Sequence, residues 1–517
     1  MIELLDTTCR DGQQHAEISF SSLDKYHILM QLDRLGLAFV ELGAPGFNLK
    51  DRELMTKPLS TTVTRPCAFG ATRRKDTAPE QDEAFRTLID CPVYDVVLVG
   101  KSSIAHVREV LKTTAEENLK MIASSVRYAV QKGKRVIFDA EHFFDGYRLD
   151  PDYAVATLAA ARENGARRLV LCDTNGGAFP ETVKSVTKEV KNRFPDAVIG
   201  VHCHNDNGLA LANTLAAIEG GATHVQGTLL GFGERCGNLN LSTLIPLLTL
   251  GMGIELTPEV RLGELTPIAR GIAEIANVNL PDNMPYVGRA AFAHKAGMHA
   301  DGVLKDRQTF EFIDPALVGN ARRLLLSDAA GKHLLLNKLQ PYFPTLTKDD
   351  PALDSVAAAL KERESNGYSY EGAEASFVLL ANRILHGKNA PYDVVNYSLH
   401  DNSEEGEASA QVSVRVGSAI KTATARGLGP VHALDITLRK CLVSFYPFLN
   451  ACNLIDYKVR VVNPSSATGA VVRVLITSSD GKHIWQTVGV SPDIIRASFD
   501  ALTESYDYAL TMLTNER

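Results

Sequence analysis

No two cysteines of this chain are spaced as a Cys-x-x-Cys pair, and no apolar run is long enough to cross a membrane. The eight cysteines stand singly, at positions 9, 67, 91, 172, 203, 236, 441 and 452. Scattered cysteines of this kind are typical of reduced thiols, which argues against a disulfide framework or a zinc ribbon. The chain begins with a strand-like run and lacks a basic segment followed by an apolar stretch, so we expect no signal peptide and a cytoplasmic protein.

Positive charge is also scarce, because 54 Lys and Arg face 61 Asp and Glu, giving a net charge of -7 at pH 7. No dense stripe of Lys and Arg offsets this balance, which argues against nucleic acid or a membrane surface as a partner. We expect the short basic run at residues 73–75 to be a solvated loop. The remaining composition, 45% hydrophobic and 22% charged over 517 residues, is that of a globular protein with room for two or three domains.

Apolar runs rich in β-forming residues recur through the first half of the chain. They predict strands at residues 2–5, 38–42, 66–69, 95–99, 135–138, 168–171, 198–201 and 223–226. Apolar residues three to four apart predict helices between them, at residues 22–35, 104–117, 151–164, 180–192 and 209–219. Eight such units over about 250 residues predict an α/β fold of the (β/α)₈ TIM-barrel type. A doubly wound open sheet is the structural alternative.

Two histidines stand out within the seventh predicted unit. His202 and His204 are two residues apart next to a predicted strand, so their imidazoles would point to the same face. Asp11 follows the first predicted strand and offers a carboxylate. Two histidines and one carboxylate with open positions suit a divalent metal. A pair of half-buried structural histidines is the alternative for the His-x-His spacing taken alone.

Polar residues gather where the other predicted strands end. In a TIM barrel the carboxyl ends of the strands form the active site, so residues that follow different strands meet in one ring. The ring would contain Arg10 and Asp11, Glu41, Asp139 and Glu141, residues 173–175, residues 202–206, and the glycine-rich loop at residues 231–238. This convergence favours a metal site over two structural histidines.

Several motifs resemble one enzyme family. They are DTTCRDGQQ (6–14), FVELGAPGFN (39–48), VLCDTNGG (170–177), the stretch from GVHCHNDNG to GFGERCGN (200–238) and AHKAGMHADGVLK (293–305). In this order they are similar to the acyl-CoA-condensing synthases of the 2-isopropylmalate, homocitrate and citramalate group. Residues 283–289, 292–295 and 318–323 are most similar to the longer type of citramalate synthase.

The resemblance implies that acetyl-CoA, as co-substrate, condenses with a 2-keto acid at a divalent metal, followed by hydrolysis of the thioester. Asp11, His202 and His204 would bind the metal, with Asn238 as a weaker fourth ligand. The metal, Mn²⁺, Mg²⁺ or Zn²⁺, would polarise the keto group as a Lewis acid. The expected product from pyruvate is citramalate, made on the route to isoleucine.

The resemblance also assigns residues to the substrates. Arg10 would bind the keto acid and stabilise the alkoxide that forms. Thr174 would hold the carboxylate, and Glu141, a catalytic residue by the same resemblance, would line the side-chain pocket. Glu41 would also be one of the residues that bind the substrate. A simple helix N-cap is the alternative role for Thr174.

His299 lies outside the predicted barrel and matches a family histidine that serves as general base. In the family this segment reaches the active site of the partner subunit, which implies a homodimer with shared sites. Phe310 stands where relatives often have Tyr, so a hydroxyl is lacking there. A structural histidine is the alternative role for His299.

Beyond the barrel, predicted for residues 1–260, the pattern becomes helical at 261–388, which suggests a linker that completes the partner's site. Residues 389–517 are β-rich and carry a weak repeat. Strands at 410–416 and 471–477 are each followed by a helix, at 431–441 and 493–513. By resemblance this α+β domain is regulatory and binds an amino-acid effector, and a dimerisation module without ligand is the alternative.

Three other functions compete with a citramalate synthase. An isopropylmalate or homocitrate synthase would use a larger keto acid in the same chemistry. A lyase or aldolase on the same barrel would cleave the bond, although such enzymes usually end near the barrel. A non-catalytic paralogue could bind an amino acid through the tail, and the presence of Arg10, Asp11, His202 and His204 argues against it.

Overall fold

The computed structural model describes residues 1–294, 297–324, 332–370, 372–387, 390–402, 406–462 and 470–513. The chain divides into two compact units. The first contains Met1–Phe292 and Ile313–Arg322, and the second contains Ala293–Phe312 and Arg323–Arg517. The borders predicted at residues 260 and 388 remain predictions. In the described part of the chain, no helix is both long and apolar enough to cross a lipid bilayer.

The first unit is built on a closed barrel of parallel strands, in which each strand pairs with the next and β8 returns to β1. The strands are β1 (Glu3–Asp6), β2 (Phe39–Gly43), β3 (Arg65–Ala71), β4 (Asp95–Lys101), β5 (Arg135–Glu141), β6 (Arg168–Asp173), β7 (Val198–Cys203) and β8 (His224–Gly227). All eight predicted strands are present, so the TIM barrel is confirmed and the open sheet is wrong.

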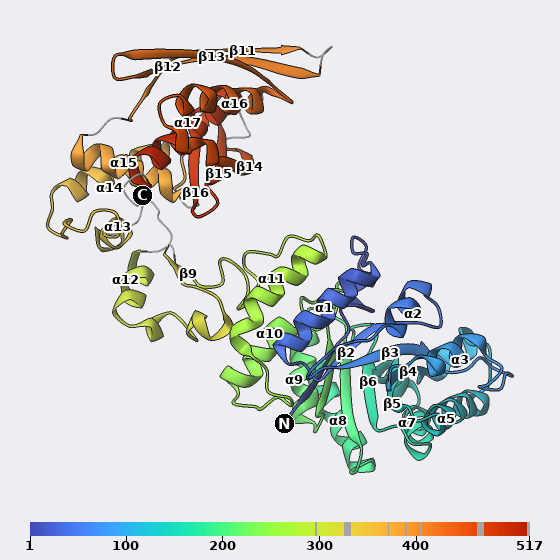
Figure 1. Cartoon of the computed structure of the whole chain (residues 1–517). Coiled ribbons are helices and arrows are strands. Elements are labelled where there is room, and N and C mark those ends of the chain that lie inside the picture. The colour runs from blue at the N-terminus through green and yellow to red at the C-terminus, as the bar shows by residue number, and fades with distance from the viewer. Residues whose placement is uncertain are drawn as a thin grey trace. The chain divides into compact units, whose positions relative to one another are not determined.

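Helices surround this barrel (Figure 1). They are α1 (Ser22–Leu35), α2 (Leu49–Thr56), α3 (Glu83–Asp90), α4 (Ile104–Glu109), α5 (Ala115–Gln131), α6 (Phe143–Leu149), α7 (Pro151–Glu163), α8 (Pro180–Arg193), α9 (Ala210–Glu219), α10 (Leu241–Pro246) and α11 (Leu265–Ile275). A capping box at Ser21 and Asp24 begins α1, and Gly36 ends it at a φ of 96°.

One predicted helix is wrong. The stretch 104–117 is not continuous, because α4 ends at Glu109 and Lys112 adopts a φ of 51°. Thr114 then caps a new helix, α5, by accepting a hydrogen bond from the backbone N–H of Glu117 at 3.2 Å. The Thr-x-x-Glu spacing is a helix-start signal that overrides the apolar periodicity on either side of it.

Two apolar cores hold the barrel. The larger one lies between strands and helices, and a smaller one fills the barrel interior with inward side chains that include Leu5, Phe39, Val97, Ile137 and Val170. The interior is therefore packed at mid-height. Polar inward residues lie above and below this plug, at the two ends of the strands.

The second unit contains helices and two separate antiparallel sheets. Its helices are α12 (Gly297–Lys305), α13 (Lys332–Leu339), α14 (Ala352–Ser365), α15 (Glu374–His386), α16 (Pro430–Val443) and α17 (Ile494–Met512). Its strands are β9 (Ala293–His294), β10 (Arg323–Leu324), β11 (Asp393–Asn402), β12 (Glu407–Val416), β13 (Ala419–Gly427), β14 (Asn453–Val461), β15 (Val472–Ser479) and β16 (Ile484–Ser491).

The predicted repeat in the tail is present in the structure. The sheet β11-β12-β13 is followed by α16, and the sheet β14-β15-β16 by α17. Each copy has a register shift at the same place in its first strand, between Val394 and Asn396 and between Leu454 and Asp456. The tail is thus an α+β domain of two similar halves, as the strand and helix order predicts.

Candidate metal and substrate site

Strand β7 and the loop after β1 bring three potential metal ligands together. His202 is an inward residue of β7, His204 follows the strand on the same face, and Asp11 begins the short turn after β1. Each is buried, and one ligand atom from each lies within 4.8 Å of the others. His202 Nε2 is 3.4 Å from Asp11 Oδ2. The three residues that the sequence singled out therefore form one cluster at the carboxyl end of the barrel.

Two buried oxygens are unpaired on residues of this cluster or next to it in the fold, where Asn238 forms a β-bridge with His204. Asp11 Oδ1 and Asn238 Oδ1 are buried and have no hydrogen-bond partner in the described structure. Asn238 Nδ2 donates to the carbonyl of Phe232 at 3.0 Å, which leaves the amide oxygen for another partner. A Cβ at Gly233 would lie 2.3 Å from Asn238 Nδ2, so the loop needs glycine there. Two nitrogens and two such oxygens fit a divalent cation.

The charges of Asp11 and His204 also fit a cation. Burial raises the pKa of Asp11, but Arg10 and His202 outweigh burial and hold that pKa well below its usual range. Burial and the neighbouring His202 lower the pKa of His204 to about 4. Burial lowers the pKa of His202, yet the bond to Asp11 raises it overall. Asp11 is therefore ionised and His204 neutral near pH 7, and these are the forms that bind metals.

Arg10 lies beside the cluster. Its guanidinium donates to Glu41 through Nε and to Asp11 through Nη1, the latter at 3.1 Å. The same group lies 4.0 Å from the centre of the Phe69 ring. These contacts fix a cation next to the potential metal site. Glu41 is completely buried behind Arg10 and is not among the residues that line the cavity.

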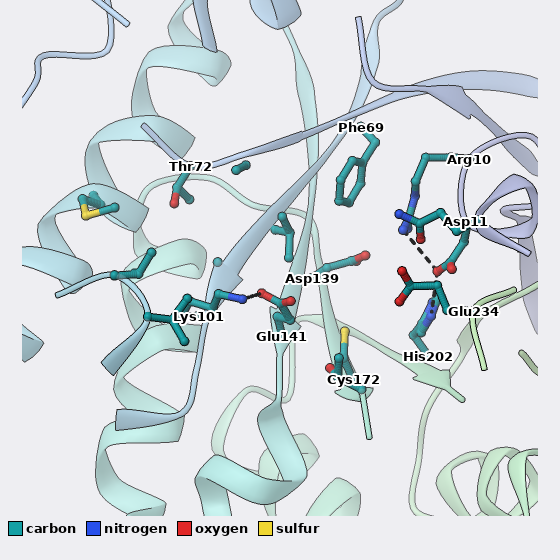
Figure 2. A pocket seen from close by; sticks show the side chains of 18 of the residues that line it. Arg10, Asp11, Phe69, Thr72, Lys101, Asp139, Glu141, Cys172, His202 and Glu234 are labelled. Carbon is teal, nitrogen blue, oxygen red and sulfur yellow. Dashed lines mark hydrogen bonds and ion pairs between the residues drawn. The ribbon is translucent and has the colours of Figure 1, made fainter. Parts of the chain in front are cut away.

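A cavity of about 720 Å³ opens from these residues. Figure 2 shows Arg10 and Asp11 beside His202, and Lys101 and Glu141 pointing toward each other elsewhere in its wall. Lys101 Nζ lies 2.5 Å from Glu141 Oε2. Side chains from the turn after β1 and from the carboxyl ends of β4, β5 and β7 thus contribute to one pocket.

Thr174 also lines this cavity. Its Oγ1 accepts a hydrogen bond from the backbone N–H of His142 at 2.8 Å. His142 adopts a left-handed conformation with a φ of 57°, which turns the chain directly after Glu141. The hydroxyl hydrogen of Thr174 remains available for a ligand in the pocket.

Sequence reasoning missed part of the pocket wall. The expectation of a solvated loop at residues 73–75 is wrong for Arg73, which is buried, bonded to Glu117, and lines the cavity with Arg74 and Lys75. Lys101 was missed because the predicted strand ended at residue 99. Lys101 and Asp95 are an even number of residues apart on β4, so their side chains point to the same, inward face. This spacing would have indicated that Lys101 belongs to the site.

His299 is not among the residues that line the barrel cavity. It belongs to α12 of the second unit, where its exposed ring stacks on Phe310 with centroids 4.2 Å apart. The ring of Phe310 thus packs against the imidazole. The base role of His299 remains a prediction.

Comparisons with known proteins match nearly the whole chain. The HMGL-like family model matches residues 1–272, the homocitrate synthase post-HMGL domain-like model 286–367, and the LeuA allosteric (dimerisation) domain 371–510. The (R)-citramalate synthase of Aquifex aeolicus (strain VF5) is 45% identical over 517 residues, covering 98% of this chain and 98% of that protein. This chain belongs to the citramalate synthase family.

Other relatives agree with membership of the citramalate synthase family. The (R)-citramalate synthase of Synechocystis sp. (strain ATCC 27184 / PCC 6803 / Kazusa) is 43% identical over 99% of this chain and 96% of that protein. A 2-isopropylmalate synthase of Shewanella frigidimarina (strain NCIMB 400) is 29% identical over 96% of this chain and 93% of that protein. The predicted family is confirmed, and the chain is an enzyme with an HMGL-like barrel and a LeuA-type tail.

Proposed function

We propose that this enzyme condenses acetyl-CoA with pyruvate and hydrolyses the thioester, giving citramalate and free CoA. One observation carries the proposal: Asp11, His202 and His204 converge beside Arg10 in a barrel cavity of a chain that is 45% and 43% identical, over nearly its whole length, to two (R)-citramalate synthases. The acetyl methyl carbon would form a bond to the keto carbon, the keto oxygen would gain a proton, and water would release CoA from the thioester.

Asp11, His202 and His204 would hold a divalent metal, with Asn238 Oδ1 as a further ligand. The mixed nitrogen and oxygen donors suit Mn²⁺, Mg²⁺ or Zn²⁺. When bound, such an ion supplies Lewis-acid polarisation of the keto carbonyl.

Three side chains of the pocket would act on the keto acid. Arg10 is fixed by Glu41 and Asp11, so its guanidinium can stabilise the oxygen that becomes negative as the carbon-carbon bond forms. Thr174 would donate its free hydroxyl hydrogen to the carboxylate. Glu141, paired with Lys101, would border the space for the side group of the keto acid.

The cavity has room for a second substrate. A volume of about 720 Å³ exceeds what a three-carbon keto acid fills, and Arg73, Arg74 and Lys75 form part of its wall. We assign this basic stretch to the phosphates of acetyl-CoA, because a cationic rim attracts a polyanionic co-substrate.

A base must remove a proton from the acetyl methyl group, and we assign this role to His299 of the partner subunit. The LeuA allosteric (dimerisation) model over residues 371–510 supports a dimer. Mixing inactive Arg10→Ala and His299→Ala chains under subunit exchange should restore activity, because some sites then combine an intact Arg10 with an intact His299. Mixed dimers that form and stay inactive would exclude the shared site.

The tail is assigned to an effector, an amino acid at the end of the pathway, on the strength of the same model match. Isothermal titration of isoleucine and leucine into the full chain tests this assignment, with alanine as the control ligand. Absence of heat for both branched amino acids would refute it.

The reaction itself is tested with a panel of keto acids. Acetyl-CoA is supplied with pyruvate, 2-ketobutyrate, 2-ketoisovalerate or 2-ketoglutarate, and the released thiol of CoA is followed. We expect the highest kcat/KM with pyruvate. Preference for 2-ketoisovalerate or 2-ketoglutarate would contradict the assignment and indicate an isopropylmalate or homocitrate synthase.

A further inference from the structure

A chain of buried hydrogen bonds lies behind His202. Its Nδ1 is 2.9 Å from Oε1 of Gln226, and Nε2 of Gln226 donates to Oδ1 of Asp139 at 2.9 Å. His202, Gln226 and Asp139 are 5%, 0% and 3% exposed, so water does not compete for these bonds. The parallel register of β7 and β8 places His202 directly beside Gln226. Asp139 reaches the same amide from β5, 87 residues away in sequence.

The two ends of the Gln226 amide are not equivalent. The NH₂ end can only donate and the oxygen can only accept. Because the NH₂ group donates to Asp139, the oxygen is turned toward His202 and accepts a hydrogen bond from Nδ1. A neutral imidazole with its hydrogen on Nδ1 keeps the lone pair on Nε2, and Nε2 is the atom that lies 3.4 Å from Asp11 Oδ2.

We propose that Gln226 and Asp139 are positioning residues that hold His202 in the tautomer and orientation required to bind the metal. This inference rests on the proposed metal site. Asp139 orients the amide, the amide orients the imidazole, and the imidazole presents Nε2 beside Asp11. Partners behind a ligating histidine typically change metal affinity by about 10–100-fold when they are lost.

In a simpler role, the buried side chains of His202, Gln226 and Asp139 would only provide one another with hydrogen-bond partners. In that case, loss of a partner would lower the stability of the fold without a specific effect on metal binding. The two roles differ in metal affinity measured on folded protein, so the test measures both quantities on the full chain.

The first comparison uses Gln226→Leu and His224→Leu. Both residues are buried inward positions of β8, but His224 lies at the opposite end of the barrel, beside Glu3. Mn²⁺ is titrated into metal-free protein by calorimetry, and the melting temperature of each variant is recorded. We expect Gln226→Leu to bind Mn²⁺ about 10–100-fold more weakly than the original chain. We expect His224→Leu to melt earlier and to bind Mn²⁺ normally.

The second comparison exchanges the two polar groups. Asp139→Asn alone frees the amide of Gln226 to rotate, because the introduced carboxamide can either donate or accept, and this variant should bind Mn²⁺ more weakly. Adding Gln226→Glu should restore binding, since the introduced carboxylate accepts from His202 and also from the carboxamide that replaces Asp139. If the two substitutions acted independently, the second would not restore Mn²⁺ affinity. Recovery in the double variant therefore shows that positions 139 and 226 are energetically coupled.

Three results separate the proposals. If Gln226→Leu, folded, binds Mn²⁺ as tightly as the original chain, or the double variant binds no better than Asp139→Asn, the positioning role is overturned. If the original chain binds no Mn²⁺, the metal site and the positioning role both fail. If Mn²⁺ binding follows our expectation while the keto-acid panel shows no condensation, the positioning role stands and the proposed reaction fails.

Discussion

The two ends of the barrel interior are both polar, but the carboxylates at the two ends have different hydrogen-bond and ion-pair partners. At the amino end, Arg168 donates two hydrogen bonds to Glu3, at 2.6 and 2.7 Å, and Asp95 lies between Arg65 and Arg135. Among the described residues, the buried side-chain atoms without a hydrogen-bond partner in this layer are nitrogens, on Arg65, Arg135 and His224. The carboxylates at this end are therefore already neutralised by arginine.

At the carboxyl end, Asp11, Glu41 and Asn238 each have one buried oxygen without a hydrogen-bond partner in the described structure. Two histidines join them, and Arg10 supplies the guanidinium that contacts the carboxylates there. The amino-end layer thus pairs its carboxylates with arginine, whereas the carboxyl-end layer leaves buried carboxylate and amide oxygens without partners. We therefore interpret the carboxyl end as suited to a cation and the amino end as a layer that serves stability.

The largest expected effect comes from Asp11→Asn. The carboxamide removes the negative charge that balances a divalent cation, so we expect turnover to fall by at least about 10³-fold, since a Lewis acid contributes several kcal/mol. Mn²⁺ affinity should fall with it. Glu3→Gln at the amino end is the matched control, and it should leave both quantities unchanged. Equal losses in the two variants would remove the distinction between the ends.

Arg10→Ala should have the next largest effect. Loss of one fixed donor to a developing oxyanion typically costs about 10²–10³-fold in kcat. Mn²⁺ should still bind, because removing a cation beside Asp11 cannot weaken the attraction of that carboxylate for another cation. Steady-state kinetics and Mn²⁺ titration on the same preparation measure the two effects. Loss of Mn²⁺ binding in folded Arg10→Ala would contradict the assigned division of roles.

Arg168→Met tests the amino end directly. This substitution removes the bidentate hydrogen bonds of Arg168 to Glu3, and we expect the free energy of unfolding to fall by about 3 kcal/mol. Chemical denaturation of the full chain measures this loss through the transition of the barrel unit. Mn²⁺ affinity of the folded variant should match that of the original chain. A variant that is stable but binds Mn²⁺ poorly would show that the two ends are coupled.

The smallest expected effect is a dependence on pH. Burial raises the pKa of Glu3, but His224 and Arg168 outweigh burial and lower it from 4.5 to about 2. A carboxyl group with a lowered pKa stabilises the fold above its unfolded value and loses this contribution as pH falls toward about 2. The melting-temperature gap between the original chain and Glu3→Gln should therefore be constant above about pH 5 and close below it. A gap that widens on acidification would refute this.

Apolar patterning predicted the barrel because its strands are buried on both faces. The same patterning missed the ends of β4 and β5, since Lys101 and Glu141 interrupt the apolar run at the point where the strand enters the pocket. The break between α4 and α5 was missed because Thr114 acts through a backbone cap, which periodicity does not record.

Spacing and resemblance were sufficient to predict that Asp11, His202 and His204 lie together, because the two histidines share one strand face and Asp11 follows a strand end. The partnership of Gln226 with Asp139 was not predictable in this way. It requires the register of β7 against β8 and the closure of the barrel, which bring together residues 87 positions apart. Arg73 was misjudged because its charge suggested solvent, whereas Glu117 and Ser124 hold it in the wall.

We expect one divalent cation to bind at the carboxyl end of the barrel, between Asp11, His202 and His204. Anomalous diffraction from crystals of the full chain grown with Mn²⁺ tests it most directly. We expect one strong peak in each barrel, with ligand atoms of Asp11, His202 and His204 at about 2.0–2.3 Å. A peak at the amino end instead, or no peak between these three side chains at saturating Mn²⁺, would contradict the account.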